Sequence, residues 1–417
     1  MQLKTLLNFV EKHKGFVYDR FELDRDAKQP QLRITIRAAK RSRPRCSRCL
    51  RRSPTYDTLA VRTWRMVPLW GIAVFFLYAM RRVSCASCEA VVVEAVPWSE
   101  GKQRITKSFA WYLAAWAKRM SWQEVGRAFH VSWDTVFNAV RMAVGYGLEH
   151  RVVDDVQTIG VDEVMWHRRG RQFLTVVYAL DEGRRRLLWI GRGRSEATLD
   201  DFFDWYGDAA SRLKAVASDM WRAYLNVIRR RAPRALNILD RFHIVANVHK
   251  AVDQVRALEA RELHAQGLQT LKHTRWLFLK SPENLSGSQA ASLRELVKIN
   301  LKTLRAYLLK EDLRQLWSHA SAVQGCLFLT DWCRRAKASR LAPMARVARS
   351  LDKHSELILN WFFTGGAVSS GAVEGLNNKL KVITRRSYGF RSYDVTTTAL
   401  YHAMGNLPEP EHVHRFA

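Results

Sequence analysis

The sequence predicts a multi-domain α/β protein, and three observations lead to that prediction. The chain has 417 residues, 47% of them hydrophobic, which is enough for two or three domains with a sizeable core. Between residues 155 and 245, β-branched runs alternate with helical segments. Two C-x-x-C pairs stand nearer the N-terminus, in a separate strand-rich stretch. We therefore expect a cysteine-bearing region ahead of an α/β core.

The N-terminal region, residues 1–100, is expected to contain a zinc ribbon. "RCSRC" holds Cys46 and Cys49, and "SCASC" holds Cys85 and Cys88. Each pair offers two sulfur ligands from one tight turn, and zinc prefers four such ligands in a tetrahedron. A pair of redox dithiols is the alternative, but no thioredoxin-like βαβ pattern surrounds these cysteines.

The longest apolar run, "MVPLWGIAVFFLYAM" at residues 66–80, is shorter than the ~20 residues that span a bilayer. It contains Pro68 and Gly71, and we interpret it as two strands joined by a turn. No N-terminal segment resembles a signal peptide. We therefore expect no membrane association and a cytoplasmic location, where disulfides are rare.

Residues 101–150 are expected to form a helix-turn-helix domain. Ser121 followed by Glu124 matches a capping box at the start of one helix. "VGRAFHVS" supplies a short turn, and Ser132 can cap a second helix, the candidate reader of the DNA major groove. Two short helices with a turn also occur in ordinary helical bundles.

Residues 151–245 are expected to form the first part of an RNase H-like core. "QTIGVDEVMW", "RQFLTVVYALD" and "RRLLWIGRG" read as three consecutive strands of an antiparallel meander. A helix, a strand ending in Asp219, another helix and a further strand ending near Asp240 follow. That order of elements is the order of an RNase H-like fold.

Two further segments complete the predicted organisation. Residues 246–360 show no convincing strand and are rich in Arg, Leu, Ala and Lys, so we expect a helical insertion. Residues 361–417 would supply the closing helix of the core, "AVEGLNNKLKVITRR", and a C-terminal tail.

The charge of the chain indicates a polyanionic partner. The formal net charge is +29, from 68 Lys+Arg against 39 Asp+Glu. An enzyme of small molecules rarely needs such an excess, whereas binding to nucleic acid is driven by the neutralisation of phosphates. Because the arginines are spread along the whole chain, a generally basic proteome is the alternative explanation.

Three acids are the candidate catalytic residues. Asp162 and Asp219 end neighbouring strands of the predicted sheet, and Glu374 would approach from the closing helix. Their hard oxygen ligands suit Mg²⁺ or Mn²⁺, and two such ions can promote in-line attack on a phosphate. Glu163 is the rival to Asp162, and acids at strand ends also serve as helix caps or turn formers.

The closing helix also carries the candidate DNA contacts. If it is helical, one face carries Glu374, Asn377, Asn378 and Lys381. A salt-bridged surface helix is the ordinary interpretation; a metal ligand beside a phosphate-binding surface is the sharper one. The residues expected to contact DNA are Asn377, Asn378, Lys379, Lys381, Arg385 and Arg386.

Four blocks of this sequence resemble the ISL-three family of bacterial insertion-sequence transposases: "TIGVDEV", "VASDMWRAY", "DRFHIVANV" and "GAVEGLNNKLKVITRRSYGFRSY". The paired cysteines and the helix-turn-helix extend the resemblance to nearly the whole chain. It implies a DDE catalytic domain whose triad is Asp162, Asp219 and Glu374. "DRFH" is similar to a D-x-x-H signature of related transposases and implies a supporting role for Asp240 and His243, whose alternatives are a helix cap and a core histidine.

The resulting hypothesis is a bacterial DNA transposase acting near the nucleoid. It would bind terminal inverted repeats through residues 1–150, cut strands with Mg²⁺ or Mn²⁺, and join the freed 3′-hydroxyl to target DNA. Structural Zn²⁺ would hold the ribbon, and a homodimer or larger assembly would act on the DNA. The alternatives are a non-catalytic regulator built from ribbon and helix-turn-helix, and an RNase H-like structure-specific nuclease.

Overall fold

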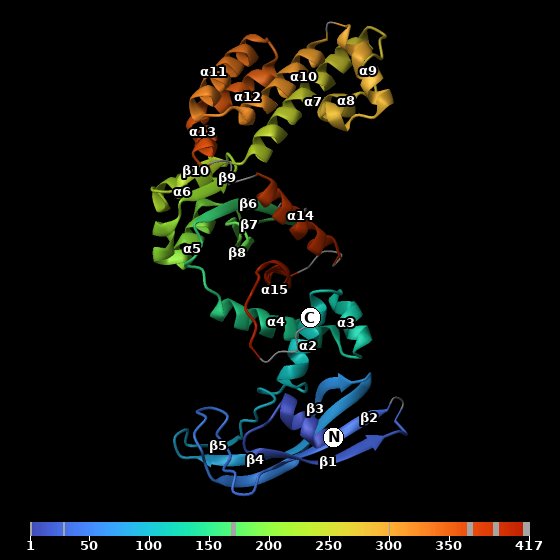
Figure 1. Ribbon diagram of the computed structural model, residues 1–417, viewed down its shortest axis with the longest axis vertical. Coiled ribbons are helices and arrows are strands. Elements are labelled where there is room, and N and C mark those ends of the chain that lie inside the picture. The colour runs from blue at the N-terminus through green and yellow to red at the C-terminus, as the bar shows by residue number, and fades with distance from the viewer. Residues whose placement is uncertain are drawn as a thin grey trace. The chain divides into compact units, whose positions relative to one another are not determined.

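The computed structural model describes most of the chain, namely residues 2–27, 30–167, 172–299, 301–364, 370–386 and 392–411. The chain divides into two compact units, which are described separately (Figure 1). The first unit comprises Met1–Arg151 and Arg386–Ala417, and the second comprises Val152–Arg385.

The first unit begins with a five-stranded sheet. Its order is β1-β2-β4-β3, and β5 also pairs with β4; the strands are β1 (Phe16–Asp24), β2 (Gln31–Ala38), β3 (Thr55–Leu69), β4 (Ile72–Cys85) and β5 (Ala90–Val93). Trp70 and Gly71 form the turn between β3 and β4, with φ of 49° and 82°, as a two-residue hairpin with positive φ at both positions requires. The predicted pair of strands within residues 66–80 is therefore confirmed.

Aromatic side chains form the core of this sheet. Trp64, Phe76 and Trp98 are fully buried, and the short helix α1 (Leu3–Val10) adds Leu7 to the same cluster. Large buried rings remove much apolar surface from water, and this burial holds the sheet together. The long β3–β4 hairpin also explains why the two cysteine pairs are far apart in sequence: it lies between them.

Three helices follow: α2 (Lys107–Ala117), α3 (Trp122–Ala128) and α4 (Trp133–His150). The last two are the pair of helices with a short turn that the sequence predicts. Ser121 and Glu124 form a complete capping box on α3, and Ser132 caps α4 by accepting from the Thr135 N–H. A Cβ on Gly126 would lie 2.9 Å from the Val131 carbonyl oxygen, so only glycine allows the turn to pack this closely.

The last helix, α15 (Tyr393–Met404), packs against α4 in the first unit. The sequence grouped residues 361–417 as one closing segment of the core, whereas the structure divides them near Arg386. Close packing explains the division, because a Cβ on Gly147 of α4 would lie only 2.5 Å from Cβ of Leu407. This position in α4 therefore admits no side chain larger than that of glycine.

The second unit is built on a mixed five-stranded sheet of order β10-β9-β6-β7-β8. β6 (Thr158–His167), β7 (Gln172–Ala179) and β8 (Arg186–Arg192) form an antiparallel meander. β9 (Ala215–Ser218) is parallel to β6, and β10 (Leu236–Leu239) is parallel to β9. These directions and this order are those expected for an RNase H-like core.

Helices cover both faces of this sheet. On one face, α5 (Glu196–Tyr206) and α6 (Arg222–Arg231) bury Phe202 and Tyr224 against Val161 and Val177. On the other face, α14 (Ser370–Arg386) lies beside β6 (Figure 1). A Cβ on Gly160 would lie 3.0 Å from Cγ2 of Val373, so the missing side chain lets α14 approach the strand.

A helical insertion separates β10 from α14. Its α-helices are α7 (Arg241–Ala265), α8 (Arg275–Leu279), α9 (Gly287–Val297), α10 (Lys302–Leu313), α11 (Ala322–Ala338), α12 (Ala342–Lys353) and α13 (Ser355–Phe363). One hydrophobic cluster joins Leu239 of β10 with Val252 of α7 and Trp332 of α11. The described part of residues 246–360 contains no strand, as the sequence predicts.

A search of the described helices for a membrane span found none with the necessary length and apolar character.

Candidate active site and cysteine centre

Strand register brings Asp162 and Asp219 to the same place in the sheet. β9 pairs with β6 from Thr158↔Ala215 to Gly160↔Ala217. Continuing that parallel register by two residues puts Asp162 opposite Asp219, just beyond the last paired residues. Asp162 lies inside the longer strand β6 rather than at its end. It pairs with Val176 of β7, but the pairing of β6 with β9 ends before it.

The carboxylate of Asp162 is buried and joins three elements. Its Oδ2 accepts a hydrogen bond from Nδ2 of Asn377 in α14, and its Oδ1 lies 3.5 Å from Nε2 of His243 in α7. Oδ1 also accepts from the N–H of Glu163 at 2.7 Å. Asn377 is held from its other side by the hydroxyl of Tyr178, which donates to Oδ1 at 2.9 Å. Residues far apart in sequence therefore meet at Asp162.

Glu374 lies on the same side of α14 as Asn377, one helical turn earlier, and is half-buried. Its charge acts on Asp240, the N-cap of α7, whose side chain accepts from the Phe242 N–H. Burial raises the pKa of Asp240 to about 6, and the charges of Asp162 and Glu374 add to this effect. The structure thus brings Glu374 and Asp240 into the electrostatic neighbourhood of Asp162.

Asp219 and His243 complete the cluster. Burial raises the pKa of Asp219, and the charge of Asp162 contributes in the same direction. The hydrogen bond with Asp162 raises the pKa of His243 to about 9, with further support from Asp240 and Asp219. His243 is therefore a cation at neutral pH, placed among partly buried acids that repel one another.

A second set of contacts lies beside the acids, around Arg194. Its Nη1 donates to both carboxylate oxygens of Glu163, at 3.1 and 3.2 Å. The guanidinium carbon lies 4.0 Å from the ring centre of Phe173 and 4.9 Å from that of Trp221. Glu163, the rival to Asp162, is thus engaged by an arginine. Asp162 is the acid next to Asn377 and His243.

The basic residues of α14 lie mainly on its exposed surface. Asn378, Lys379, Lys381 and Arg385 are exposed, whereas Asn377 is half-buried against Asp162. The side chain of Arg386 lies outside the described residues. The structure therefore separates the predicted DNA contacts into an exposed set and one inward-facing amide.

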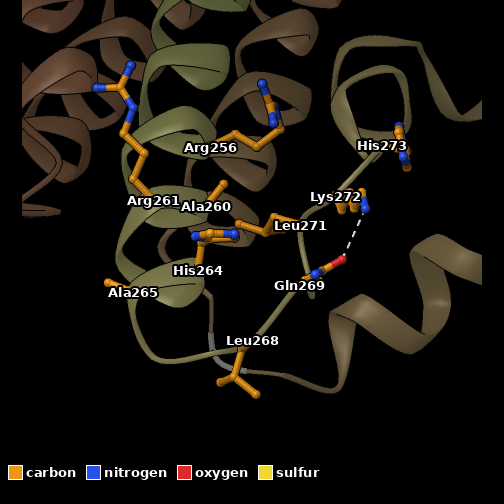
Figure 2. A pocket seen from close by; sticks show the side chains of 10 residues that line it. All are labelled: Arg256, Ala260, Arg261, His264, Ala265, Leu268, Gln269, Leu271, Lys272 and His273. Carbon is orange, nitrogen blue, oxygen red and sulfur yellow. Dashed lines mark hydrogen bonds between the residues drawn. The ribbon is translucent and has the colours of Figure 1, made fainter.

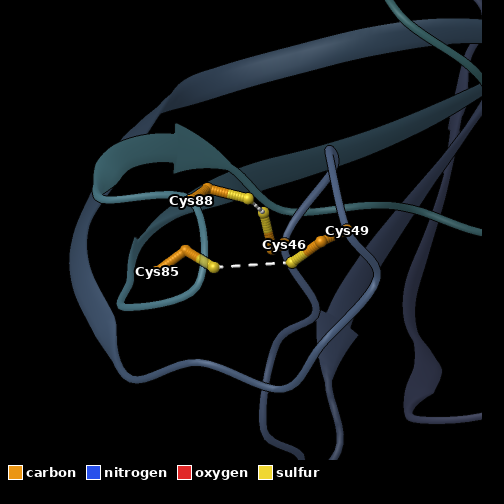
Figure 3. Close-up of side chains that lie close together, drawn as sticks. All are labelled: Cys46, Cys49, Cys85 and Cys88. Carbon is orange, nitrogen blue, oxygen red and sulfur yellow. Dashed lines mark hydrogen bonds between the residues drawn. The ribbon is translucent and has the colours of Figure 1, made fainter.

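The four cysteines come together as Figure 3 shows, and their sulfur atoms all lie within 4.8 Å of one another. Sγ of Cys46 is 3.8 Å from Sγ of Cys88, and Sγ of Cys49 is 3.5 Å from Sγ of Cys85. Each pair is followed by a residue with positive φ, Leu50 at 59° and Glu89 at 49°. Within the described ranges this is the only group of three or more potential ligands that meets this distance.

The donor sets of the two sites suit different ions. A hydrogen bond from the Cys49 backbone lowers the pKa of Cys46, and one from Ser53 lowers that of Cys85 to about 6, while neighbouring sulfurs raise that of Cys88 to about 12. Four adjacent cysteines can all ionise only beside a cation, and soft sulfur ligands suit zinc. The carboxylates of Asp162, Asp219 and Glu374 are hard ligands that suit Mg²⁺ or Mn²⁺.

Comparisons with known proteins agree with this architecture. A family model described as a transposase matches residues 159–400, and a second, described as the helix-turn-helix domain of transposase family ISL3, matches residues 94–144. The transposase for insertion sequence element IS1001 of Bordetella parapertussis is 31% identical over 353 residues, covering 84% of this chain and 86% of that protein. The transposase for IS1557 of Mycobacterium tuberculosis (strain CDC 1551 / Oshkosh) is 31% identical over 409 residues, covering 91% and 90%.

One solved structure, the Drosophila P element transposase strand transfer complex, covers 72% of this chain and 91% of its own, with a TM-score of 0.37 and 11% identity. A likeness this distant supports no conclusion about the present chain. The two family models and the curated relatives define the class of protein as a transposase with a DDE-type domain and a helix-turn-helix domain. More particularly, the chain belongs to transposase family ISL3, which confirms the resemblance seen in the sequence.

Sequence reasoning missed the residues that hold the acids in place. Tyr178 supports Asn377, and Arg194 connects Glu163 with Trp221. A tyrosine within a buried strand and an arginine after a strand are common, and no sequence spacing distinguishes these two as residues of a functional site. Of these residues, only Trp221 could have been found from its position in the sequence, because it follows Asp219 by two residues.

Proposed function

We propose that this chain is the DNA transposase of a bacterial insertion sequence, with Asp162, Asp219 and Glu374 as its catalytic acids. In strand cutting, a water oxygen attacks phosphorus and the 3′-oxygen leaves with a proton. In strand joining, that 3′-hydroxyl loses its proton and attacks a phosphodiester of the target. The target's 3′-oxygen leaves and becomes a new 3′-hydroxyl, so the element end is joined to the target's 5′-phosphate. Divalent metal ions, when held by the three acids, neutralise the charge that develops on the phosphate and activate the attacking oxygen.

The contact of Asn377 with Asp162 carries this proposal, because it holds α14 against β6, and Glu374 lies one turn before Asn377 on the same side of that helix. Asn377 has a positioning role rather than the DNA contact expected from the sequence. His243 donates to Asp162 and places a positive charge in the cluster, and Asp240 anchors the start of α7 beside it. Exposed Asn378, Lys379, Lys381 and Arg385 are placed to meet phosphates, and we retain Arg386 as a further candidate.

The first unit is proposed to recognise the terminal inverted repeats. On α4, Asn138 and Arg141 are exposed and joined by a 2.9 Å hydrogen bond, which makes them candidates for contacts with base edges in the major groove. Zn²⁺ held by Cys46, Cys49, Cys85 and Cys88 would fix the two cysteine turns as a ribbon. Because both ends of an element must be processed together, we propose a dimer or larger assembly on DNA.

The acid assignment can be tested with the single variants Asp162→Asn, Asp219→Asn and Glu374→Gln. Each keeps the shape of its side chain but removes a metal-binding charge. Strand cutting of DNA bearing an inverted repeat, measured in Mg²⁺ or Mn²⁺, should be abolished, while binding to the repeat persists.

Glu295→Gln is the matched control, because Glu295 is an exposed acid of the same unit paired with Lys298 at 2.7 Å. It should cut like the unaltered protein. Normal cutting by any of the three acid variants would refute that residue's role. Cutting by the unaltered protein with no strand joining would indicate a nuclease rather than a transposase.

A further inference from the structure

A basic cavity of about 480 Å³ lies at the far end of α7, within the helical insertion. Figure 2 shows its cationic and histidine side chains on α7 and on the segment that follows it. They are Arg256, Arg261, His264, Lys272 and His273. Most of them are exposed, so the cavity is open to a large ligand rather than closed around a small one.

Among the described residues no acid lines this cavity, and each acid of α7 already has partners. Glu262 pairs with Lys302 at 2.6 Å, and buried Glu259 accepts from the backbone N–H groups at the start of α10. Asp253 pairs with Arg256 and with Arg275, at 2.8 and 3.1 Å.

Two full charges of the cavity are therefore not neutralised by a carboxylate. Lys272 makes a 3.1 Å hydrogen bond to the neutral amide oxygen of Gln269. Arg261, exposed on α7, has no acid within salt-bridge distance among the described residues. Cations left in this way attract phosphate groups.

The cavity has a fixed relation to the acid cluster, because one helix links them. α7 begins beside Asp162, where His243 is bonded, and Arg261 follows His243 by 18 residues on the same helix, which corresponds to about 27 Å. Val248, Val252 and Val255 anchor α7 in the hydrophobic cluster of the insertion. At 3.4 Å per base pair, that separation is the length of about eight base pairs of duplex DNA.

We propose that this cavity binds the phosphate backbone of a DNA duplex engaged at the catalytic acids, about eight base pairs from the phosphate that is cut. The inference rests on the proposed function and extends it by giving the insertion a DNA-contacting role. Because the rim of the cavity is open, a DNA backbone that passes through it is favoured as the ligand. A free nucleotide would need a pocket that encloses it.

The test uses the full chain with the double substitution Arg261→Ala/Lys272→Ala. The control is Arg334→Ala/Lys298→Ala, which removes the same charges from exposed insertion residues paired with Asp331 and Glu295. Binding is measured on duplexes that extend about five or about fifteen base pairs to either side of the cutting site.

Affinity for the long duplex should fall as the salt concentration rises from about 50 to about 200 mM. The fall should be about tenfold larger for the unaltered protein than for the cavity variant, because the variant lacks two phosphate contacts. On the short duplex the two proteins should bind alike, and the control should behave as unaltered protein on both. Arg261→Gln/Lys272→Gln, which keeps side-chain bulk, should repeat the result and so excludes a folding defect.

Equal salt dependence of variant and unaltered protein on the long duplex would overturn the inference. So would a defect of the same size on the short duplex. Binding of inorganic phosphate alone that the substitutions abolish, with DNA binding unchanged, would assign the cavity to a free anion and also overturn it. Cutting of the short duplex by the unaltered protein tests the proposed function independently of these outcomes.

Discussion

Arg194 connects the two chain segments that carry the aspartates, strand β6 and the loop after β9. It holds Glu163, the residue after Asp162, and its backbone carbonyl accepts a 3.1 Å hydrogen bond from Nε1 of Trp221. The backbone N–H of Trp221 in turn donates to Oδ1 of Asp219 at 2.9 Å. One arginine therefore fixes the backbone next to both acids without contacting either of them.

We expect Arg194→Met to reduce strand cutting by about 10- to 100-fold, the usual effect of losing a residue that orients metal ligands. The methionine keeps a long apolar stem between Phe173 and Trp221 but leaves Glu163 without its cation. Arg194→Lys should recover part of the activity, because it keeps the charge but not the planar, two-bond geometry.

The informative measurement is the Mg²⁺ concentration needed for half-maximal cutting. It should rise for Arg194→Met and rise less for Arg194→Lys, while repeat binding stays constant. An unchanged metal requirement with a lowered melting temperature would show that Arg194 only stabilises the fold.

Among the secondary-structure elements, the N-terminal sheet contains a buried histidine that links its stability to pH. His13 lies against the rings of Trp98 and Tyr18, with centroid distances of 5.2 and 5.8 Å, and its Nε2 is buried without a hydrogen-bond partner. Burial lowers the pKa of His13 to about 4, so the ring is neutral at pH 7. The carboxylate of Glu11, whose Oε1 lies 4.0 Å from Nε2 of His13, therefore forms no ion pair with it at that pH.

The sign of this effect follows from proton binding. Between the ordinary histidine pKa of about 6.5 and the folded value of about 4, the unfolded state binds more protons, so stability falls as pH falls. The loss is about 3 kcal/mol at most by pH 4. We expect His13→Phe to remove this part of the acid sensitivity, measured by hydrogen exchange of β1 to β4 at pH 7 and pH 4.5.

His150→Asn, at an exposed position, is the control and should leave the acid sensitivity unchanged. Equal acid sensitivity of His13→Phe and the unaltered protein would contradict the assignment.

The two cysteine turns join the segment before β3 to the end of β4, and they have little apolar surface of their own. Only Val83, Cys46 and Cys85 are fully buried in their cluster. We therefore expect this region to depend on zinc. The purified chain should contain one zinc ion, Cys49→Ser should contain less, and Cys326→Ser, at an exposed thiol, should contain as much as the unaltered protein.

Metal content by elemental analysis and proteolysis of the loop around Cys49 provide the measurements. Chelation should expose that loop to proteases. Full zinc content in Cys49→Ser, or indifference of the loop to chelation, would contradict a zinc ribbon.

For the whole molecule, the division into two units predicts independent folding. The sheet of the first unit has its own aromatic core. The second unit has two further hydrophobic clusters, one of which joins β10 of the core to the insertion. A fragment of residues 152–386 should therefore unfold cooperatively and protect the amides of β6 in hydrogen exchange as the full chain does. It should bind DNA without preference for inverted repeats, because α4 is absent. A fragment without cooperative unfolding would show that the units depend on each other.

Much of the fold followed from local patterns. Alternation and β-branched runs predicted the meander, and Ser121 with Glu124 predicted the start of α3. The order of strands and helices predicts that Asp162, Asp219 and Glu374 converge, and for Glu374 this stays a prediction. The match to known transposases confirms the family, while the roles of individual acids remain predictions to be tested.

Sequence by itself determined the elements, their order and the residue types at strand ends, because hydrophobic periodicity and capping act over a few residues. Only the tertiary structure decided which side chains meet: that Asn377 turns inward to Asp162, that Arg194 lies between Phe173 and Trp221, and that α15 packs on α4. Such contacts depend on close packing between elements far apart in the chain, and no local spacing encodes them.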